Sequence, residues 1–371
     1  MKVAIVKQLL DTFGPWSSVR WEERTPKEHL QLWPGKAAYW EITTLLQADW
    51  YVIPQQVNTD FTYDSVLRHR GKATILKKHM QRVVPCGEIP FNTYDVVISL
   101  DPILHVPPER SALFAYFLEE HWDHRYAKSL REPLRGYDLF LAHMMDARAS
   151  LASLPQAISF PYVRHPKTLR RHFAGEPRQE AAWADWRMLA TLSCARNGND
   201  GTAGQASAKR LEEALGLPVN FRSFSLGLYY GEDPPRWGDA REYLRELGRQ
   251  KYYLGLGRAG GPGQGLADAA SLGCICFGEQ DKPYHRLICH PETLCGDLQE
   301  LPRRFRRVRA SAELQKRILA KQDENVARHF VEEPLKLLGQ ALRLKRGSPA
   351  QTERTASPQE QERACSATTG S

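Results

Sequence analysis

Short apolar runs that alternate with helical stretches constrain the fold of this chain more than any other feature. Between two of these runs, the stretch 36–48 keeps Ala38, Ile42, Leu45 and Leu46 at roughly helical spacing. Continuous apolar strands that alternate with helices are typical of a parallel sheet covered on both faces. The first 160 residues contain six such apolar runs, at 3–6, 50–53, 96–100, 113–118, 139–142 and 158–160.

A second series of the same kind follows a break in the pattern. Pro161 and Pro166 interrupt the chain and predict a linker between two domains. Beyond them the sequence predicts helices and strands in alternation, and therefore a second doubly wound unit. The strands are expected at 188–193, 219–224, 252–256 and 274–277, and the helices at 206–215, 240–247 and 266–272.

The C-terminal part is expected to be helical from 311 to about 344. Its candidate buried positions are Leu314, Ile318, Leu319, Val326, Phe330 and Val331. Pro334 is expected to kink this helix, because proline lacks a backbone donor and clashes with the preceding turn. The last segment, 347–371, has almost no apolar residues, so we expect it to be disordered.

The charge of the chain is concentrated in one segment. The whole chain has 51 Lys and Arg against 43 Asp and Glu, a formal net charge of +8. Residues 301–346 alone hold 13 Lys and Arg against five Asp and Glu, so the two αβ units are close to neutral. A basic segment of this kind either binds phosphates and anionic lipid headgroups or forms a solvated helix face. A nucleic-acid-binding body is not expected.

Cysteine usage and hydropathy favour a cytoplasmic protein. Seven cysteines are an odd number, whereas a secreted disulfide framework favours an even one. Cys274 and Cys276 alternate within an apolar run, so we interpret their thiols as strand packing and not as a zinc site. The longest apolar runs fall far short of the roughly 20 residues that a membrane-spanning helix needs. The four apolar residues after Lys2 are too few for a signal peptide.

Several chemistry-bearing residues follow the predicted strands of the first unit. Ligands of open parallel sheets bind beyond the carboxyl ends of the strands. Asp101, Glu120, His121 and His143 come just after three of these ends, where a carboxylate or an imidazole can act as general base on a hydroxyl group. The alternative is that these residues are helix N-caps or surface charges. For Asp101, which Pro102 follows directly, we favour the N-cap.

The glycine-rich loop 257–265 gives a sharper indication in the second unit. Glycines allow backbone N–H groups to approach a phosphate closely, and the following helix N-terminus favours negative charge. The loop has neither the strict GxGxxG spacing nor that of a GxxxxGK[ST] loop, so a simple flexible loop is the alternative. Its candidate phosphate-binding residues are Arg258, Gly260, Gly261, Gly263 and Gln264. Arg196 and Asn197 follow the strand expected at 188–193 and could hold a diphosphate.

The segment 263–278, which reads GQGLADAASLGCICFG, resembles the donor-binding segment of GT-B glycosyltransferases. In that family a glycine loop leads into a helix of the form acid-Ala-x-x-x-Gly, followed by a short apolar strand. Asp268 matches the acid, which typically contacts the donor ribose, and Gly263 and Gly265 match the loop that holds the diphosphate. The departures are that the acid is usually Glu and that Gly260 and Gly261 lie near the position of a second acid.

The resemblance implies an α/β protein with two tandem Rossmann-like domains that face a cleft, and a kinked C-terminal helix. We expect an acceptor-side domain at 1–163 and a nucleotide-sugar donor domain at 164–310. A basic helix at 311–346 would pack back on the N-terminal domain, and the tail would follow at 347–371. Domains of this kind position the donor on one side and the acceptor on the other.

The expected activity is a metal-independent, hexosyltransferase-like transfer of a sugar from a nucleotide-sugar donor. The acceptor would be a glycan, a lipid-linked molecule or another hydroxyl in surface polysaccharide or glycoconjugate synthesis. Glu120, His121 or His143 would take the proton of the acceptor, and no cofactor or metal is expected. The expected location is the cytoplasm, with contact of 303–346 with the inner face of the membrane if the acceptor is lipid-linked. The alternatives are a sugar-nucleotide epimerase or hydrolase of the same fold, and a non-catalytic nucleotide-binding protein.

Overall fold

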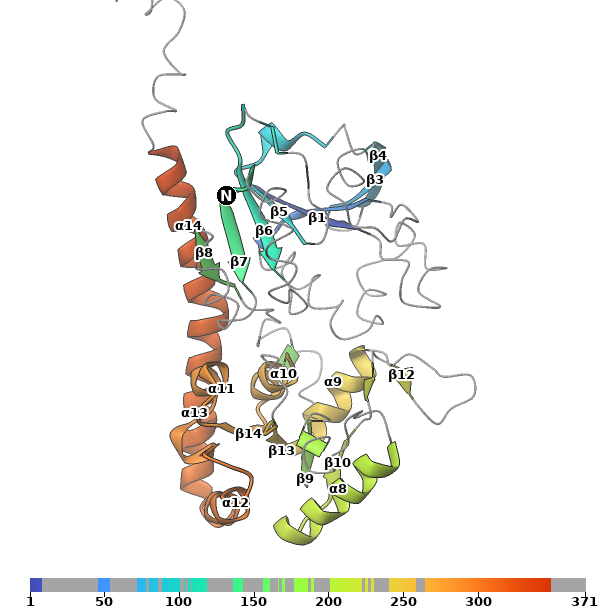
Figure 1. The fold of residues 1–371 in the computed structure, drawn as a ribbon, viewed down its shortest axis with the longest axis vertical. Helices are drawn as coiled ribbons and strands as arrows, with labels where there is room; N and C mark the ends of the chain where they lie inside the picture. The colour runs from blue at the N-terminus through green and yellow to red at the C-terminus, as the bar shows by residue number, and fades with distance from the viewer. Residues whose placement is uncertain are drawn as a thin grey trace, which may run out of the picture.

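The computed structural model of the chain contains two sheets built mainly from parallel strands, with helices packed around them (Figure 1). The described residues are 1–8, 46–53, 72–77, 80–85, 89–100, 104, 106–107, 109–118, 136–142, 156–160, 166, 169–170, 177–185, 188–189, 201–221, 224–225, 228–229, 240–257 and 264–347.

The first sheet confirms the six strands that the apolar runs predict. They are β1 (Val3–Gln8), β2 (Asp49–Ile53), β5 (Val96–Ser99), β6 (Leu113–Leu118), β7 (Leu139–Ala142) and β8 (Ala157–Ser159). These strands are mutually parallel and occur in the order β2-β1-β5-β6-β7-β8. Apolar side chains are buried on both faces, as expected for such continuous apolar strands.

An antiparallel hairpin that the sequence analysis did not predict completes this sheet. Strands β3 (Lys72–Lys77) and β4 (Met80–Pro85) pair with each other, and β3 extends the sheet beyond β2. Their sequences, KATILK and MQRVVP, mix polar and apolar residues. Edge strands do not need the continuous apolar run by which the central strands were recognised. A short 3₁₀ helix, η4 (Phe91–Thr93), precedes β5.

The second sheet is entirely parallel, in the order β10-β9-β13-β14-β15. Its helices lie within a few residues of the predicted ones where both exist. The strands are β9 (Gln179–Ala184), β10 (Val219–Asn220), β13 (Gln250–Leu254), β14 (Ile275–Glu279) and β15 (Leu294–Cys295). The helices are α8 (Gly201–Leu215), α9 (Ala240–Arg249), α10 (Gln264–Leu272) and α11 (Pro283–Ile288), with the 3₁₀ helix η6 (Pro291–Thr293).

Two predicted strands of this unit are wrong. Met188 and Leu189, taken as the start of a strand at 188–193, are helical and buried in the core beside β9. The strand lies earlier, at Gln179–Ala184, where alanines and one tryptophan form a less obvious apolar run. The strand expected at 219–224 is only two residues long, and Phe224 begins a separate hairpin of β11 (Phe224–Ser225) and β12 (Leu228–Tyr229).

The C-terminal part consists of α12 (Leu301–Arg309), α13 (Ala312–Ala327), the π-helical turn η7 (Arg328–Glu332) and α14 (Glu333–Arg346). Ser311 caps α13, because its Oγ accepts a hydrogen bond from the Leu314 N–H at 3.2 Å. Pro334 lies in the first turn of α14, where a missing N–H is tolerated, so the change of helical register occurs just before it. The predicted buried positions are buried or partly buried.

Helix α14 reaches the first sheet, whereas α12 and α13 pack on the second (Figure 1). Leu338 and Leu342 lie in the same apolar core as β1 and β5. Lys345 forms an ion pair with Asp138 at 2.6 Å just before β7. In the part of the chain that the structure describes, no helix is long and apolar enough to cross a membrane. The predicted disordered tail begins at Gly347, and all of its residues after Gly347 lie outside the described residues.

Candidate functional site

The carboxyl edge of the second sheet brings together polar groups from segments far apart in the sequence. Strand β9 ends before Asp185, β13 leads into Gly255 and Gly257, and β14 ends at Glu279. Because the strands are parallel, these residues lie at the same edge, where open α/β sheets bind their ligands.

Three residues at this edge, Gly257, Glu279 and Lys282, form a connected group that we call the Glu279 cluster. The Gly257 N–H donates a hydrogen bond to Oε1 of Glu279 at 2.8 Å, and the Lys282 ammonium lies 2.8 Å from Oε2. Lys282 also donates to the Gly257 carbonyl. The side chains of Glu279 and Lys282 are 15% and 20% exposed, so the ion pair is partly shielded but still accessible. The cluster therefore fixes the start of the glycine-rich loop and places a cation beside it.

His285 supports this cluster from behind. Its Nδ1 accepts a hydrogen bond from the Glu279 N–H at 2.9 Å, and the residue is buried. A Cβ on Gly278 would lie 3.0 Å from both Cβ and Nδ1 of His285, so only glycine allows the ring to approach this closely. The imidazole thus positions the end of β14, and it is a positioning group and not a candidate base.

Asp185 and Tyr253 form a second polar contact at the same edge. The Tyr253 hydroxyl donates to Oδ2 of Asp185 at 2.7 Å, and burial together with the charge of Asp185 raises the pKa of Tyr253 well above its ordinary value. A Cβ on Gly265 would lie 2.7 Å from the Tyr253 hydroxyl oxygen and 3.1 Å from that of Tyr243. Gly265 therefore lets the first turn of α10 approach β13, which brings the N-terminus of α10 to the edge.

Asp268 lies on α10 among buried alanines and is 2% exposed. Asp268 is thus in the second turn of the helix that begins at this edge, but it is buried in this structure. A ribose hydroxyl can reach it only if the residues around it move.

Most of the other predicted site residues lie outside the described residues. These are Glu120, His121, His143, Arg196, Asn197, Arg258, Gly260, Gly261 and Gly263, as well as Asp101. Gln264 begins α10, and only its backbone is described. Arg196 and Asn197 were predicted to follow a strand at 188–193, which is wrong, because Met188 and Leu189 are helical and the strand described here, β9, ends at Ala184 before Asp185.

Glu279, Lys282 and Asp185 were not predicted as site residues. Glu279 comes two residues after the apolar run at 274–277, which was predicted as a strand, and the rule applied to the first unit would have selected it. Lys282, three residues further, had no pattern of its own. Asp185 was missed because strand β9 was not recognised.

Cys274 and Cys276 serve the packing of the second sheet. Cys274 and Cys276 are free and buried, which confirms that they pack beside and within β14, and burial raises the pKa of the Cys274 thiol to about 12. Among the described residues, no group of three His, Cys, Asp or Glu could hold a metal ion.

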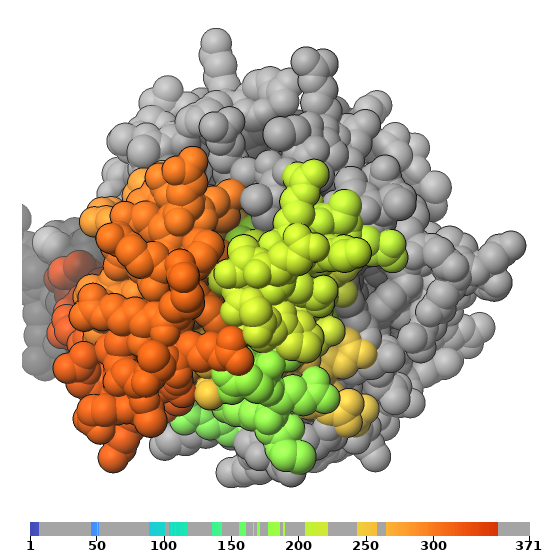
Figure 2. All heavy atoms as spheres, turned by 90° about the horizontal axis from the view of Figure 1, so that it is seen from below, coloured from blue at the N-terminus to red at the C-terminus, as the bar shows by residue number. Residues whose placement is uncertain are grey.

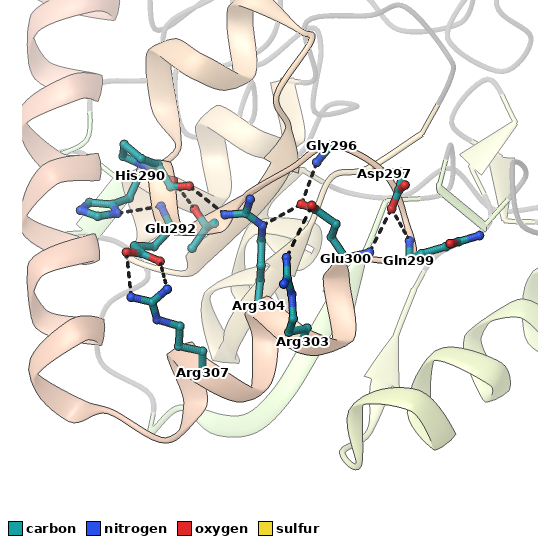
Figure 3. A network of polar contacts seen from close by, with 11 residues as sticks. His290, Glu292, Gly296, Asp297, Gln299, Glu300, Arg303, Arg304 and Arg307 are labelled. Atoms are coloured by element: carbon teal, nitrogen blue, oxygen red, sulfur yellow. Dashed lines mark hydrogen bonds and ion pairs between the residues drawn. The ribbon is translucent and has the colours of Figure 1, made fainter.

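Arg303, Arg304 and Arg307 of α12 have acidic partners just before the helix, at Glu300 and Glu292 (Figure 3). Arg304 lies 2.9 Å from Glu300, Arg307 lies 3.1 Å from Glu292, and Arg303 lies 3.6 Å from Glu300. Arg303 and Arg307 are nevertheless 75% and 67% exposed, so this is largely a solvated helix face, the second of the two interpretations of the basic segment.

No protein-family model and no curated protein sequence matches this chain. Among solved structures it resembles an alpha-glucosyltransferase in complex with UDP-glucose and DNA containing an abasic site. The identity is 9%, the coverage 92% of this chain and 99% of that chain, and the TM-score 0.50. It also resembles an alpha-glucosyltransferase in complex with UDP and a 13-mer DNA containing a central A:G mismatch. The identity is again 9%, the coverage 92% of this chain and 100% of that chain, and the TM-score 0.51.

The chain has a GT-B fold. At 9% identity the likeness shows the fold alone, with two Rossmann-like units as the resemblance of segment 263–278 implied. In a GT-B fold the Glu279 cluster lies on the C-terminal unit, at the sheet edge where a ligand is expected. The strands β6 and β7 of the first sheet point toward this unit (Figure 1).

Proposed function

We propose that this chain is a glycosyltransferase that transfers a sugar from a nucleotide-sugar donor to a hydroxyl acceptor. The observation that carries the proposal is Lys282, held by Glu279 beside the first residues of a glycine-rich loop, at the ligand-binding edge of a GT-B fold. Lysine is a common phosphate ligand, and a diphosphate leaving group needs such a charge in the transition state.

The donor would lie over the loop and α10. In this proposal Lys282 contacts the diphosphate together with Arg196, Asn197, Arg258, and the backbone of Gly260, Gly261, Gly263 and Gln264. Glu279 keeps both the loop and Lys282 in place, and Asp268 recognises the ribose after a local rearrangement. The transfer would be metal-independent and hexosyltransferase-like.

The acceptor would approach from the first sheet. Strands β6 and β7 end at Leu118 and Ala142, just before Glu120, His121 and His143, any of which could take the proton of the acceptor hydroxyl. A glycan or a lipid-linked acceptor is our first choice, and contact of 303–346 with a membrane belongs to the lipid-linked case. The alpha-glucosyltransferases were solved with DNA, so duplex DNA is the competing acceptor.

The division into an acceptor-side domain (1–163), a donor domain (164–310) and a returning helix (311–346) is part of this proposal. Four apolar clusters, two on each sheet, support the boundary between the first two parts. The residues of the first-sheet clusters come from 3–160 and from α14, and those of the second-sheet clusters come from 169–330. Helix α13 therefore packs with the second sheet, and the return to the first sheet is made by α14.

The test measures the release of free nucleotide from UDP-, GDP-, ADP-, TDP- and CMP-sugars, with and without glycan, lipid-linked and duplex-DNA acceptors. We expect one donor to be consumed, and Lys282→Met to weaken its binding about tenfold or more, since hydrogen bonds to charged groups are worth about 1.5–3 kcal/mol. Lys316→Met, the same change at an exposed position of α13, is the matched control.

Binding without turnover would favour a non-catalytic nucleotide-binding protein, and conversion of the donor without transfer would favour an epimerase or hydrolase. A complete lack of binding would contradict the proposal.

A further inference from the structure

A cavity of about 510 Å³ lies at the amino edge of the second sheet, opposite the candidate site. Its lining combines three charged residues from the starts of β9 and β13 with neutral ones from β14 and α13. The lining residues are Arg178, Glu180, Lys251, Ile275, Gln315 and Leu319. Figure 2 looks onto this end of the molecule, where the orange segment of α12 and α13 meets the green segment of β9 and the yellow-green α8. The volume is within the range of small-molecule sites, about 300–1,000 Å³.

The cations of this cavity outnumber its single carboxylate. Glu180 lies 2.7 Å from the Lys251 ammonium and 3.3 Å from the guanidinium of Arg309, and it accepts a hydrogen bond from the Tyr252 hydroxyl at 3.1 Å. Partial burial raises the pKa of Glu180, but the bonds from Lys251 and Tyr252 and the charges of Lys251 and Arg309 outweigh it and leave the pKa below its ordinary value. The carboxylate is thus neutralised locally. Arg178 and Lys251 give the lining one more positive charge than negative, and Arg309 adds a further cation beside it.

The walls of the cavity are held firmly. Arg178 donates to the carbonyls of Leu272, at 2.6 Å, and Gly273, so its guanidinium is fixed at the end of α10. The amide nitrogen of Gln315 donates two hydrogen bonds, each 3.0 Å long, to the carbonyls of Val308 and Arg309. These bonds use only the amide nitrogen, and its Oε1 has no partner among the described residues. That oxygen can accept a hydrogen bond from a ligand hydroxyl, and Ile275 and Leu319 supply apolar contact.

We propose that this cavity is a second ligand site, which binds a small organic phosphate separately from the donor crevice. A phosphate monoester carries about −1.5 to −2 charges at pH 7, and the two lining cations together with the neighbouring Arg309 attract such an anion. The hydroxyl groups and carbon skeleton of a phosphorylated sugar or polyol match Gln315, Ile275 and Leu319. The inference goes beyond the proposed function and does not depend on it.

The site is connected to the crevice by the strands themselves. Glu180 and Asp185 lie on or next to β9, and Ile275 and Glu279 are the two ends of β14. Ile275 and Glu279 are four residue steps apart, about 13 Å along the strand, so a ligand held at the amino edge does not contact the Glu279 cluster directly. Binding at the two sites can therefore be measured independently.

The experiment is calorimetric titration of the full chain at low ionic strength with inorganic phosphate, glycerol 3-phosphate and glucose 6-phosphate. We expect at least one organic phosphate to bind more tightly than inorganic phosphate. Lys251→Met should weaken this binding at least tenfold, and Leu319→Trp, which fills the cavity without changing its charge, should abolish it. The matched control Lys316→Met should bind as the wild type does. Thermal melting checks that each variant is folded.

Two results would overturn the proposal. One is that neither organic phosphate binds more tightly than inorganic phosphate. The other is that binding survives unchanged in both Lys251→Met and Leu319→Trp; its loss in Lys282→Met would then place the phosphate in the crevice. Retention of binding in Lys282→Met supports a separate site, whatever the outcome of the donor assays.

Discussion

Asp268 is the single residue whose role the resemblance and the structure describe differently. The resemblance implies a ribose contact, whereas the residue is only 2% exposed. We predict that Asp268→Asn, which keeps the shape of the side chain, lowers the affinity for the donor nucleotide about tenfold or more, because a charge-assisted hydrogen bond is lost. Calorimetry with the nucleotide that the donor panel identifies, together with the melting temperature of the free protein, checks this.

The matched control for Asp268→Asn is Glu313→Gln, the same loss of charge at an exposed position in the first turn of α13. It should leave nucleotide affinity unchanged. If Asp268→Asn lowers the melting temperature but not the affinity of the folded protein, the residue serves the packing of α10 and the ribose contact is wrong.

At this scale the sequence predicts residue types better than it predicts their partners. Gly265 and Asp268 were singled out from the loop-helix pattern, and the close approach of Gly265 to Tyr253 is a physical reason for a glycine there. The contact between Gly257, Glu279 and Lys282 joins residues more than 20 positions apart. No local spacing encodes that contact, because it depends on the register of β13 against β14.

At the scale of elements, Gln322 connects α13 to the edge of β14. Its Nε2 donates to the Cys274 carbonyl at 2.8 Å and its Oε1 accepts from the Cys276 N–H at 3.0 Å, while β15 pairs with β14 only at Gly278 and Glu279. The side chain of Gln322 therefore satisfies strand groups that no neighbouring strand reaches. Gln322→Leu should lower the free energy of unfolding by about 2–5 kcal/mol, because two buried backbone groups lose their partners.

Urea denaturation of Gln322→Leu measures this loss. Gln299→Leu, the same substitution at an exposed position, should change stability by no more than about 0.5 kcal/mol. Equal effects of the two substitutions would mean that the amide contributes nothing to the strand edge.

Apolar runs predicted elements well where burial is continuous and poorly elsewhere. The six strands of the first sheet follow from such runs, whereas the edge hairpin β3–β4 does not have one. Strand β9 was displaced because Met188 and Leu189 are more apolar than the alanines before them, although both are helical core residues. Periodicity cannot separate a short buried helix from a strand of the same composition.

At the scale of the whole molecule, Asp95 joins the beginning and the end of the described chain. It accepts a hydrogen bond from the Lys2 N–H at 2.6 Å and forms an ion pair with Arg346. The Lys2 bond and the charge of Arg346 outweigh partial burial and hold the pKa of Asp95 below its ordinary value of 3.8. The unfolded chain therefore binds the proton more readily, so this stabilisation is present above about pH 4 and is lost as the pH falls further.

We predict that Asp95→Asn costs about 1 kcal/mol at pH 7, since one backbone hydrogen bond and a solvent-screened ion pair are lost. The difference from the wild type should shrink as the pH falls below about 4, because Asp95 becomes protonated first in the unfolded chain and, at lower pH, in the folded protein. Urea denaturation at pH 7, 5 and 3 measures it. A difference that is the same at all three pH values would show that the charge of Asp95 is irrelevant.

The return of α14 to the first sheet makes the stability of that sheet depend on residues at the far end of the sequence. Leu338 is fully buried among Val3, Ile5 and Val96, although it comes after all of the second unit. Leu338→Ala should destabilise the first sheet by about 2–5 kcal/mol through loss of apolar contact and the cavity that remains. Hydrogen exchange resolved by segment should then speed up in β1 and β5 and stay unchanged in β13 and β14.

Leu344→Ala, on the same helix but 77% exposed, should leave all four strands protected. Equal loss of protection in both sheets would mean that the two units unfold as one, with α14 binding them into a single cooperative structure.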